Sequence, residues 1–149
     1  MTRAMLLGPI GCGKTTLAQA LRGDERTELK TQAIVAEGDV IDTPGEYVEH
    51  GRFNHALLLT SHEADLALLL ESAAGEESRV PPGFATMFTC PVLGVVTKVD
   101  IAPDDGIRMA RERLENAAVA EIVETSAVTG QGIVELGDAM ARLAAEGVA

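Results

Sequence analysis

Residues 8–15, Gly-Pro-Ile-Gly-Cys-Gly-Lys-Thr, fit the pattern G-x-x-x-x-G-K-[ST] and constrain the fold more than any other stretch of the chain. The mostly apolar Met1–Leu7 precedes them and predicts a short buried strand, and Thr16–Arg22 follows with apolar residues at helical spacing. Glycines allow consecutive backbone N–H groups to turn inward around an anion, and a helix N-terminus adds its positive dipole end. Strand, glycine loop and helix in this order predict a phosphate-binding loop.

Two side chains of this loop have specific predicted roles. Lys14 would reach the β- and γ-phosphates of a nucleotide, and the Thr15 hydroxyl would hold Mg²⁺. The other residues predicted to contact the nucleotide here are Gly8, Gly11, Cys12, Gly13 and Thr16. The alternative interpretation is an ordinary glycine turn between a strand and a helix, which the agreement of every fixed position with the motif disfavours.

The chain has 149 residues and a formal net charge of −11. This length fits one domain, residues 1–149, with a hydrophobic core. The acidity argues against nucleic acid or an anionic membrane as a partner held by bulk electrostatics. Cys12 and Cys90 suggest no disulfide framework and are expected to be reduced. With no signal segment ahead of the first predicted strand and no apolar run long enough to span a bilayer, we expect a cytoplasmic protein.

Strand-like and helix-like segments alternate along the rest of the chain. The predicted strands are Gln32–Ala36, Asp39–Asp42, Ala64–Leu70, Pro91–Thr97 and Glu121–Glu124. The predicted helices are Gly51–Ser61, Gly83–Phe88, Asp104–Ala117 and Gly132–Ala145. Only Glu37-Gly38 separates the first two strands, which predicts a hairpin and therefore one antiparallel edge strand. The alternation predicts an α/β fold of three layers, with a mostly parallel central sheet and helices on both faces.

Two further segments would respond to a γ-phosphate. Thr31 lies in a polar loop just before a predicted strand, where a threonine can coordinate Mg²⁺ only while a triphosphate is bound; Thr27 is a competing choice. Asp42 begins a D-x-x-G at the end of an apolar strand, so its carboxylate would join the Mg²⁺ shell and the Gly45 N–H would sense the γ-phosphate. Asp-Thr-Pro-Gly is also a good turn sequence, but its position after a strand favours the functional interpretation.

Two segments near the ends of later strands would bind a base. Residues 97–100, Thr-Lys-Val-Asp, match [NT]-K-x-D: Asp100 would accept hydrogen bonds from guanine N1–H and N2, and the Lys98 stem would lie over the ring. Thr97 stands where Asn is commoner, which removes one supporting hydrogen-bond partner. After the last short strand, the Ala127 N–H would face guanine O6 and Ser126 would orient Asp100.

With these residues, the chain resembles the small Ras-like GTPases of the translation-factor-related class over nearly its whole length. More narrowly, it resembles the EutP/PduV family of ethanolamine- and propanediol-utilisation proteins. The segments that carry this resemblance are Gly8–Thr15, Ala20–Gly23, Lys30–Ile34, Ile41–Tyr47, Pro82–Phe84 and Thr97–Asp100. The resemblance implies a small P-loop protein found alongside bacterial microcompartment systems. Because the chain begins directly at its first predicted strand, we expect no shell-targeting extension, and microcompartment association has no targeting segment to support it.

The leading functional hypothesis is a GTP-binding switch or accessory protein that hydrolyses GTP slowly with Mg²⁺. The predicted catalytic residues are Lys14, Thr31, Gly45 and Glu46. In Ras-like proteins a Gln usually follows the D-x-x-G glycine and orients the attacking water, whereas this chain has Glu46 there. Its charge would lie near an anionic phosphate, so hydrolysis should be slow without a partner. An activating or effector protein would supply what the chain lacks.

Two alternatives remain open at this point. One is an ATP-dependent phosphotransferase, similar to an acetate kinase, acting on a small carboxylic acid; Thr97 in place of Asn and Glu46 after the D-x-x-G keep it open. Asp100 argues against it, because adenine lacks the N1–H and N2 amine that guanine donates to this carboxylate. The other is an interaction module that binds a nucleotide for stability and hydrolyses nothing. Nucleotide preference, and turnover with and without an acid acceptor, separate these hypotheses.

Overall fold

The computed structural model describes residues 3–9, 12–21, 40–42, 54–75 and 80–148. Their five strands form one sheet in the order β2-β1-β3-β4-β5, and every adjacent pair is parallel. The strands are β1 (Ala4–Leu7), β2 (Val40–Asp42), β3 (Leu66–Ser72), β4 (Val92–Thr97) and β5 (Glu121–Glu124). The predicted α/β fold with a mostly parallel sheet is therefore confirmed. The antiparallel edge strand expected at 32–36 lies outside the described residues.

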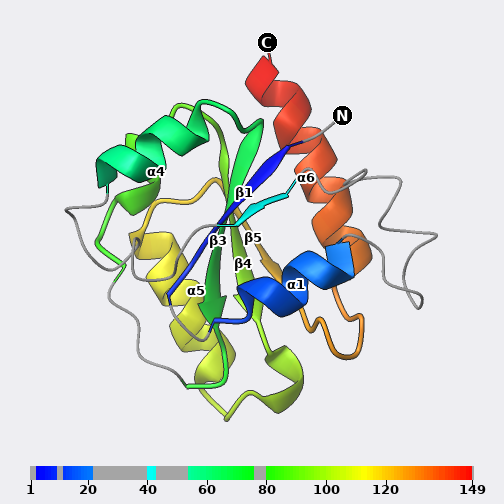
Figure 1. Cartoon of the computed structure of the whole chain (residues 1–149). Helices are drawn as coiled ribbons and strands as arrows, with labels where there is room; N and C mark the ends of the chain where they lie inside the picture. Colours follow the sequence, from blue (N-terminus) through cyan, green and yellow to red (C-terminus); the bar gives the residue numbers. More distant parts are fainter. Residues whose placement is uncertain (1–2, 10–11, 22–39, 43–53, 76–79, 149) are drawn as a thin grey trace.

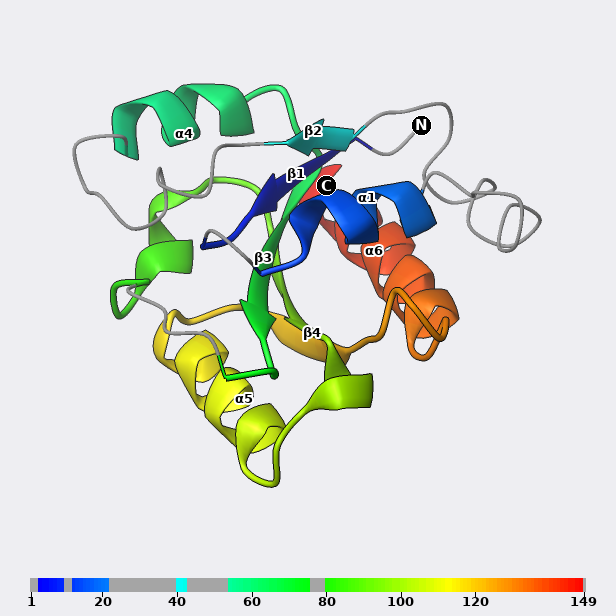
Figure 2. The same ribbon diagram turned by 60° about the horizontal axis from the view of Figure 1, so that its bottom comes forward.

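Helices cover both faces of the sheet and make three layers (Figure 1). The α-helices are α1 (Lys14–Leu21), α4 (Asn54–Ser61), α5 (Gly106–Asn116) and α6 (Ile133–Val148). α1 and α6 lie on one face, whereas α4 and α5 lie on the other, as a second view also shows (Figure 2). Two short 3₁₀ helices, η3 (Phe84–Met87) and η4 (Val99–Ile101), complete the described elements.

The continuous apolar run of β3 explains its central position. All seven residues of β3 are buried, because helices cover both faces of a parallel sheet. Alternate side chains point to opposite faces: Leu68 packs in the core beneath α1 and α6, and Leu69 packs in the core beneath α4 and α5. On α6 the predicted apolar face is confirmed, since Ile133, Leu136 and Met140 are all buried.

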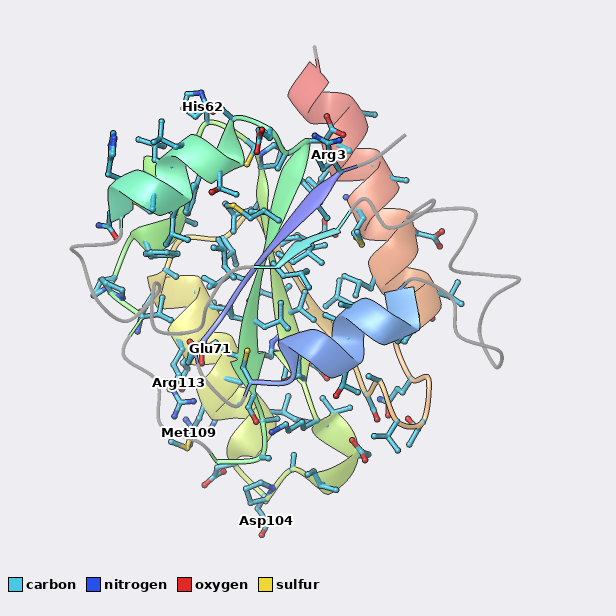
Figure 3. All side chains as sticks on the ribbon, viewed as in Figure 1. Arg3, His62, Glu71, Asp104, Met109 and Arg113 are labelled. Carbon is cyan, nitrogen blue, oxygen red and sulfur yellow. The ribbon has the colours of Figure 1, made fainter. Side chains whose placement is uncertain are left out.

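β3 continues to Ser72, beyond its predicted end at Leu70, and Glu71 in this extension carries a buried carboxylate. Glu71 is 1% exposed, and its carboxylate lies 3.8 Å from the guanidinium of Arg113 on α5. Figure 3 shows the two side chains side by side at the α5 face of the sheet. An ion pair of this kind lowers the cost of burying a charge in an apolar layer.

The other predicted element boundaries differ from the observed ones by a few residues. α1 begins at Lys14 rather than Thr16, so the last motif residues form its first turn. The segment predicted as a helix at Gly83–Phe88 forms only the four-residue η3. Both cysteines are free, as expected. Within the described part of the chain, none of the helices has the length and apolar character needed to cross a membrane.

Candidate functional site

Three loops meet at the carboxyl edge of the sheet, where parallel strands all end. The loop after β1 leads into α1, the loop after β4 contains η4, and the loop after β5 leads toward α6. β1 lies between β2 and β3, so the chain connections diverge to opposite sides of it. Open α/β sheets bind ligands at such a switch point, outside the carboxyl ends of the strands. The topology therefore gathers sequence motifs that are separated by more than one hundred residues.

The described part of the phosphate loop is tightly packed against β3. A side-chain carbon added at Gly8 would lie 2.5 Å from the Cys12 sulfur and 3.1 Å from the Leu70 carbonyl oxygen, so only glycine fits there. Gly13 has φ +95°, a conformation that favours glycine, and the Leu17 amide donates to its carbonyl at 2.9 Å. The loop thus turns directly into the N-terminus of α1, where backbone N–H groups lack helical partners.

Thr97, the last residue of β4, connects the base motif to the phosphate loop. Its hydroxyl donates a 2.6 Å hydrogen bond to the Cys12 carbonyl oxygen, and the side chain is buried. The sequence predicts that replacing Asn by Thr loses a supporting hydrogen bond. In the structure, the Thr97 hydroxyl makes this buried bond to the phosphate loop because β4 ends close to the loop.

Lys98 adopts the left-handed conformation, with φ 61° and ψ 33°. Such a conformation is uncommon outside glycine and is often found where a side chain must be directed at a site. The Lys98 Cε lies 3.8 Å from the position that a Cβ on Gly13 would occupy, so the stem runs beside the phosphate loop. Asp100 follows within η4 and is exposed.

The loop after β5 is held by hydrogen bonds to the same region. Thr125 is fully buried; its hydroxyl donates to the Val96 carbonyl at 2.9 Å, and its own carbonyl accepts from the Val99 amide at 3.2 Å. The Ser126 hydroxyl accepts from the Thr129 amide at 3.1 Å, within its own loop. That Ser126 orients Asp100 stays a prediction.

One cavity of about 150 Å³ joins these three loops. Its lining is mostly apolar, with a lysine and a carboxylate among the polar groups. The lining residues are Gly13, Thr16, Leu17, Thr97, Lys98, Asp100, Ile101, Thr125, Ala127 and Val128. Six of these, Gly13, Thr16, Thr97, Lys98, Asp100 and Ala127, are sequence-predicted nucleotide contacts. The arrangement suits a planar ring that is held by apolar contacts and read at its edge by a carboxylate.

The remaining predicted residues are described in part or not at all. Lys14 and Thr15 form the first turn of α1 by their backbone. Asp42 ends β2 and is paired in register with Leu6, two residues before the phosphate loop. Hydroxyl and carboxylate oxygens are ligands that Mg²⁺ prefers, and that Thr15 and Asp42 hold this ion stays a prediction. The predicted residues Gly11, Thr31, Gly45 and Glu46 lie outside the described residues.

Sequence reasoning missed four residues that line the cavity, namely Leu17, Ile101, Thr125 and Val128. Leu17 is one of the apolar residues at helical spacing in Thr16–Arg22, a pattern that predicts a helix and no ligand contact. Ile101 and Val128 are single aliphatic residues in loops, where periodicity provides no signal. Thr125 could have been noticed, because it directly precedes the Ser-Ala pair at the end of a strand.

Comparison with known proteins decides the family. The PduV-EutP family, described as "Ethanolamine utilisation - propanediol utilisation", matches residues 1–142. The chain belongs to this family. It is 41% identical to the "Propanediol utilization protein PduV" of Citrobacter freundii, covering 91% of both chains. It is 37% identical to the "Probable acetate kinase EutP" of Salmonella typhimurium, covering 96% of this chain and 91% of the relative. The resemblance predicted from the motifs is confirmed.

Solved structures show the same fold. The translation elongation factor SelB of Methanococcus maripaludis matches with a TM-score of 0.69 without nucleotide and 0.67 in complex with the GTP analogue GppNHp. Identity is 23% in both cases, and the match covers 95–97% of this chain but only 33% of SelB. This PduV-EutP protein therefore has the fold of P-loop GTPases, as predicted.

Proposed function

We propose that this protein binds guanine nucleotides with Mg²⁺ and hydrolyses GTP slowly, as a switch or accessory protein in ethanolamine or propanediol utilisation. The observation that carries the proposal is the single cavity shared by Gly13 of the phosphate loop and by Lys98 and Asp100. A phosphate loop alone would accept any nucleoside triphosphate. A carboxylate that lines the same cavity favours guanine, because guanine has N1–H and N2 donors for it and adenine does not.

Different residues would bind the phosphates, the Mg²⁺ ion and the attacking water. Backbone N–H groups of the phosphate loop and of the first turn of α1 would bind the phosphates, with Lys14 as a cationic partner. Thr15, Thr31 and Asp42 would hold Mg²⁺, which supplies charge neutralisation at the phosphates when bound. Glu46 would face the attacking water through a carboxylate rather than the usual amide, which keeps intrinsic hydrolysis slow. A partner protein would then set the rate.

Nucleotide titration of the wild type and Asp100→Asn tests the proposal. We expect GDP and GTP to bind far more tightly than ADP and ATP to the wild type. Asp100→Asn should weaken GDP about 100-fold, since two hydrogen bonds to a charged acceptor are lost. The affinity of Asp100→Asn for xanthosine diphosphate should rise relative to the wild type, because xanthine has a carbonyl where guanine has the N2 amine. Asp104→Asn is the matched control, an exposed aspartate outside the cavity, and should bind as the wild type does.

A second candidate is an ATP-dependent phosphotransferase acting on a small carboxylic acid. The name of the 37% identical Salmonella relative, "Probable acetate kinase EutP", favours it. Its test is ADP and acyl phosphate formation from ATP with acetate or propionate. Acid-dependent turnover with ATP, together with unchanged binding in Asp100→Asn, would replace the GTPase proposal with this one. Guanine binding without any turnover would instead leave a nucleotide-stabilised interaction module.

A further inference from the structure

A second hollow lies at the carboxyl edge of the sheet, on the face that α5 covers. Its volume is about 410 Å³, and it lies between the loop after β3 and the first turns of α5. Ser72 and Gly75 line one wall, and Met109 and Arg113 line the other. The residues that line this α5 hollow are all different from those that line the candidate nucleotide cavity. The two hollows are therefore separate features of the same sheet edge.

Close packing fixes both walls of the α5 hollow. A side-chain carbon added at Gly106, the first residue of α5, would overlap the Ala73 carbonyl oxygen, so the helix start lies directly against the loop after β3. The Ala73 amide donates to the Thr97 carbonyl at 2.9 Å. The Ala74 amide donates to the Ser72 hydroxyl at 3.0 Å. A surface whose backbone is held before binding loses little conformational entropy when a partner docks.

Met109 gives the α5 hollow an apolar surface that solvent reaches. Met109 is 44% exposed, although most large apolar side chains of the described chain are buried. Its spacing from Gly106 and Arg113 places the three residues on one side of α5, and Figure 3 shows Met109 and Arg113 together there. Methionine suits a docking surface, because its flexible and polarizable side chain adapts to the shape of a partner.

The two arginines near the α5 hollow already pair with carboxylates of their own. Arg113 lies 3.8 Å from the Glu71 carboxylate, which is buried. Arg108 donates a 2.7 Å hydrogen bond to Glu112 and lies farther, 3.8 Å, from the Asp105 carboxylate. These pairs compensate the positive charge around the hollow, so its remaining acidic groups determine its sign.

Asp104 and Asp105 are these acidic groups, and both line the α5 hollow just before the helix begins. Asp105 is the N-cap residue of α5, but its side chain makes no capping hydrogen bond and is 71% exposed. The Asp104 side chain is exposed and forms no ion pair with another residue of the described chain. The α5 hollow therefore combines an apolar surface with excess negative charge, which is complementary to a basic group.

The exposure of its lining indicates a protein segment as the occupant rather than a small molecule. Sites for small molecules bury roughly 70–90% of the ligand surface, whereas most residues that line the α5 hollow are exposed. We propose that the α5 hollow is a docking site for a partner protein, with a basic side chain at Asp104 and Asp105 and a neighbouring apolar one on Met109. Apolar contacts would then supply affinity, and the carboxylates would select the partner. This proposal goes beyond the proposed function and does not depend on which nucleotide is bound.

The probe for this proposal is the peptide acetyl-Gly-Leu-Arg-Leu-Gly-amide, titrated into the isotope-labelled full chain while its backbone amide NMR signals are followed. We expect saturable shifts concentrated at Gly75, Gly106 and Met109, with a Kd of about 1 mM. The same peptide with Gln in place of Arg should bind about tenfold more weakly, because it lacks the positive charge.

Charge variants test the role of the carboxylates. Asp104→Asn combined with Asp105→Asn should weaken the arginine peptide about tenfold. The matched control is Glu135→Gln combined with Asp138→Asn, which removes the same charge from exposed positions of α6, on the other face of the sheet. This control should bind the peptide as the wild type does. Urea denaturation of each variant checks that the fold is kept.

An apolar variant tests the role of Met109. Met109→Ala should weaken the peptide about threefold, from the apolar area that is no longer buried against it. Leu59→Ala is its control, since Leu59 is a 57% exposed aliphatic residue on α4 outside the α5 hollow. Both substitutions lie at exposed positions and should leave the free energy of unfolding nearly unchanged.

Each outcome of the titrations decides the proposal. Shifts confined to the α5 hollow, weakened by its own variants and not by the controls, support it. Shifts spread over α6, or an equal loss in the α6 control, overturn it, because binding would then follow the net charge of −11 alone. The absence of saturable shifts at millimolar peptide also overturns it. Shifts at the same amides that depend on protein concentration without peptide would assign the hollow to a second copy of this chain and overturn it too. GDP titration is a separate measurement, so each of these results leaves the proposed function intact.

Discussion

The hydroxyl of Thr97 donates a buried 2.6 Å hydrogen bond to the carbonyl oxygen of Cys12, 85 residues earlier in the chain. This bond joins the end of β4 to the phosphate loop, and it does so with a side chain shorter than the Asn more common at this position. The base side and the phosphate side of the candidate site are therefore tied together through one hydroxyl. A change at Thr97 should affect both fold stability and nucleotide binding.

Thr97→Val removes that hydroxyl and keeps the shape of the side chain. We expect the free energy of unfolding to fall by about 1–2 kcal/mol, because a buried hydrogen bond is lost, and GDP affinity to fall about fivefold. Urea denaturation and GDP titration measure the two effects. Thr97→Ser keeps the donor and is the control, expected to lie close to the wild type in affinity. Equal GDP affinity in the Val and Ser variants would show that the Thr97–Cys12 hydrogen bond does not affect nucleotide binding.

Arg113→Met tests the buried ion pair at the α5 face. The Glu71 carboxylate is 1% exposed, so removing the guanidinium 3.8 Å away leaves a buried charge less compensated. We expect the free energy of unfolding to fall by about 2–3 kcal/mol at pH 7, below the range for fully buried pairs because Arg113 is 26% exposed. Arg108→Met, which removes an exposed pair within α5, should cost less than about 0.5 kcal/mol. Adding Glu71→Gln to Arg113→Met should restore part of the loss.

The fold could be predicted largely because strong local signals agreed with one another. The apolar run that becomes β3, the period of α6 and the glycine loop before α1 all indicated the same parallel layered arrangement. Element boundaries were less accurate. The apolar run predicts a strand that ends at Leu70, whereas β3 continues through Glu71, which pairs with Arg113, to Ser72. That partner lies in a distant helix, which local sequence cannot reveal.

Residues of the candidate site could be predicted where a motif specifies the residue type. They could not be predicted where only tertiary packing brings a residue to the cavity. Asp100 and Lys98 occupy positions where the base motif specifies the residue type, so the pattern alone predicts them. Ile101 and Val128 belong to the cavity only because two loops from different strands approach each other in three dimensions. The bond from Thr97 to Cys12 was likewise invisible, since it depends on where β4 ends relative to the phosphate loop.

Glu46→Gln should accelerate intrinsic GTP hydrolysis. It removes a negative charge that the proposed mechanism places near the phosphates and supplies the amide usual in Ras-like proteins. We expect the single-turnover rate of phosphate release to rise about fivefold, which corresponds to roughly 1 kcal/mol of electrostatic repulsion. Removal of Mg²⁺ with EDTA should abolish release in both proteins. Glu63→Gln, at an exposed glutamate after α4, is the control and should hydrolyse at the wild-type rate. A slower Glu46→Gln variant would instead assign the carboxylate a direct role in orienting water.

The pair of Arg142 and Glu121 predicts a pH-dependent contribution to stability. Two 2.8 Å hydrogen bonds from Arg142 on α6 hold the pKa of Glu121 on β5 below its ordinary value of 4.5. A depressed folded-state pKa stabilises the fold above the unfolded pKa, and this contribution is lost as the pH falls through the folded value. Glu121→Gln should therefore lower the free energy of unfolding by less than about 1 kcal/mol at pH 7, since solvent reaches the pair. Well below pH 4.5, the same substitution should leave the free energy of unfolding unchanged. Denaturation across this range measures it, and an equal cost at both pH values would contradict the assignment.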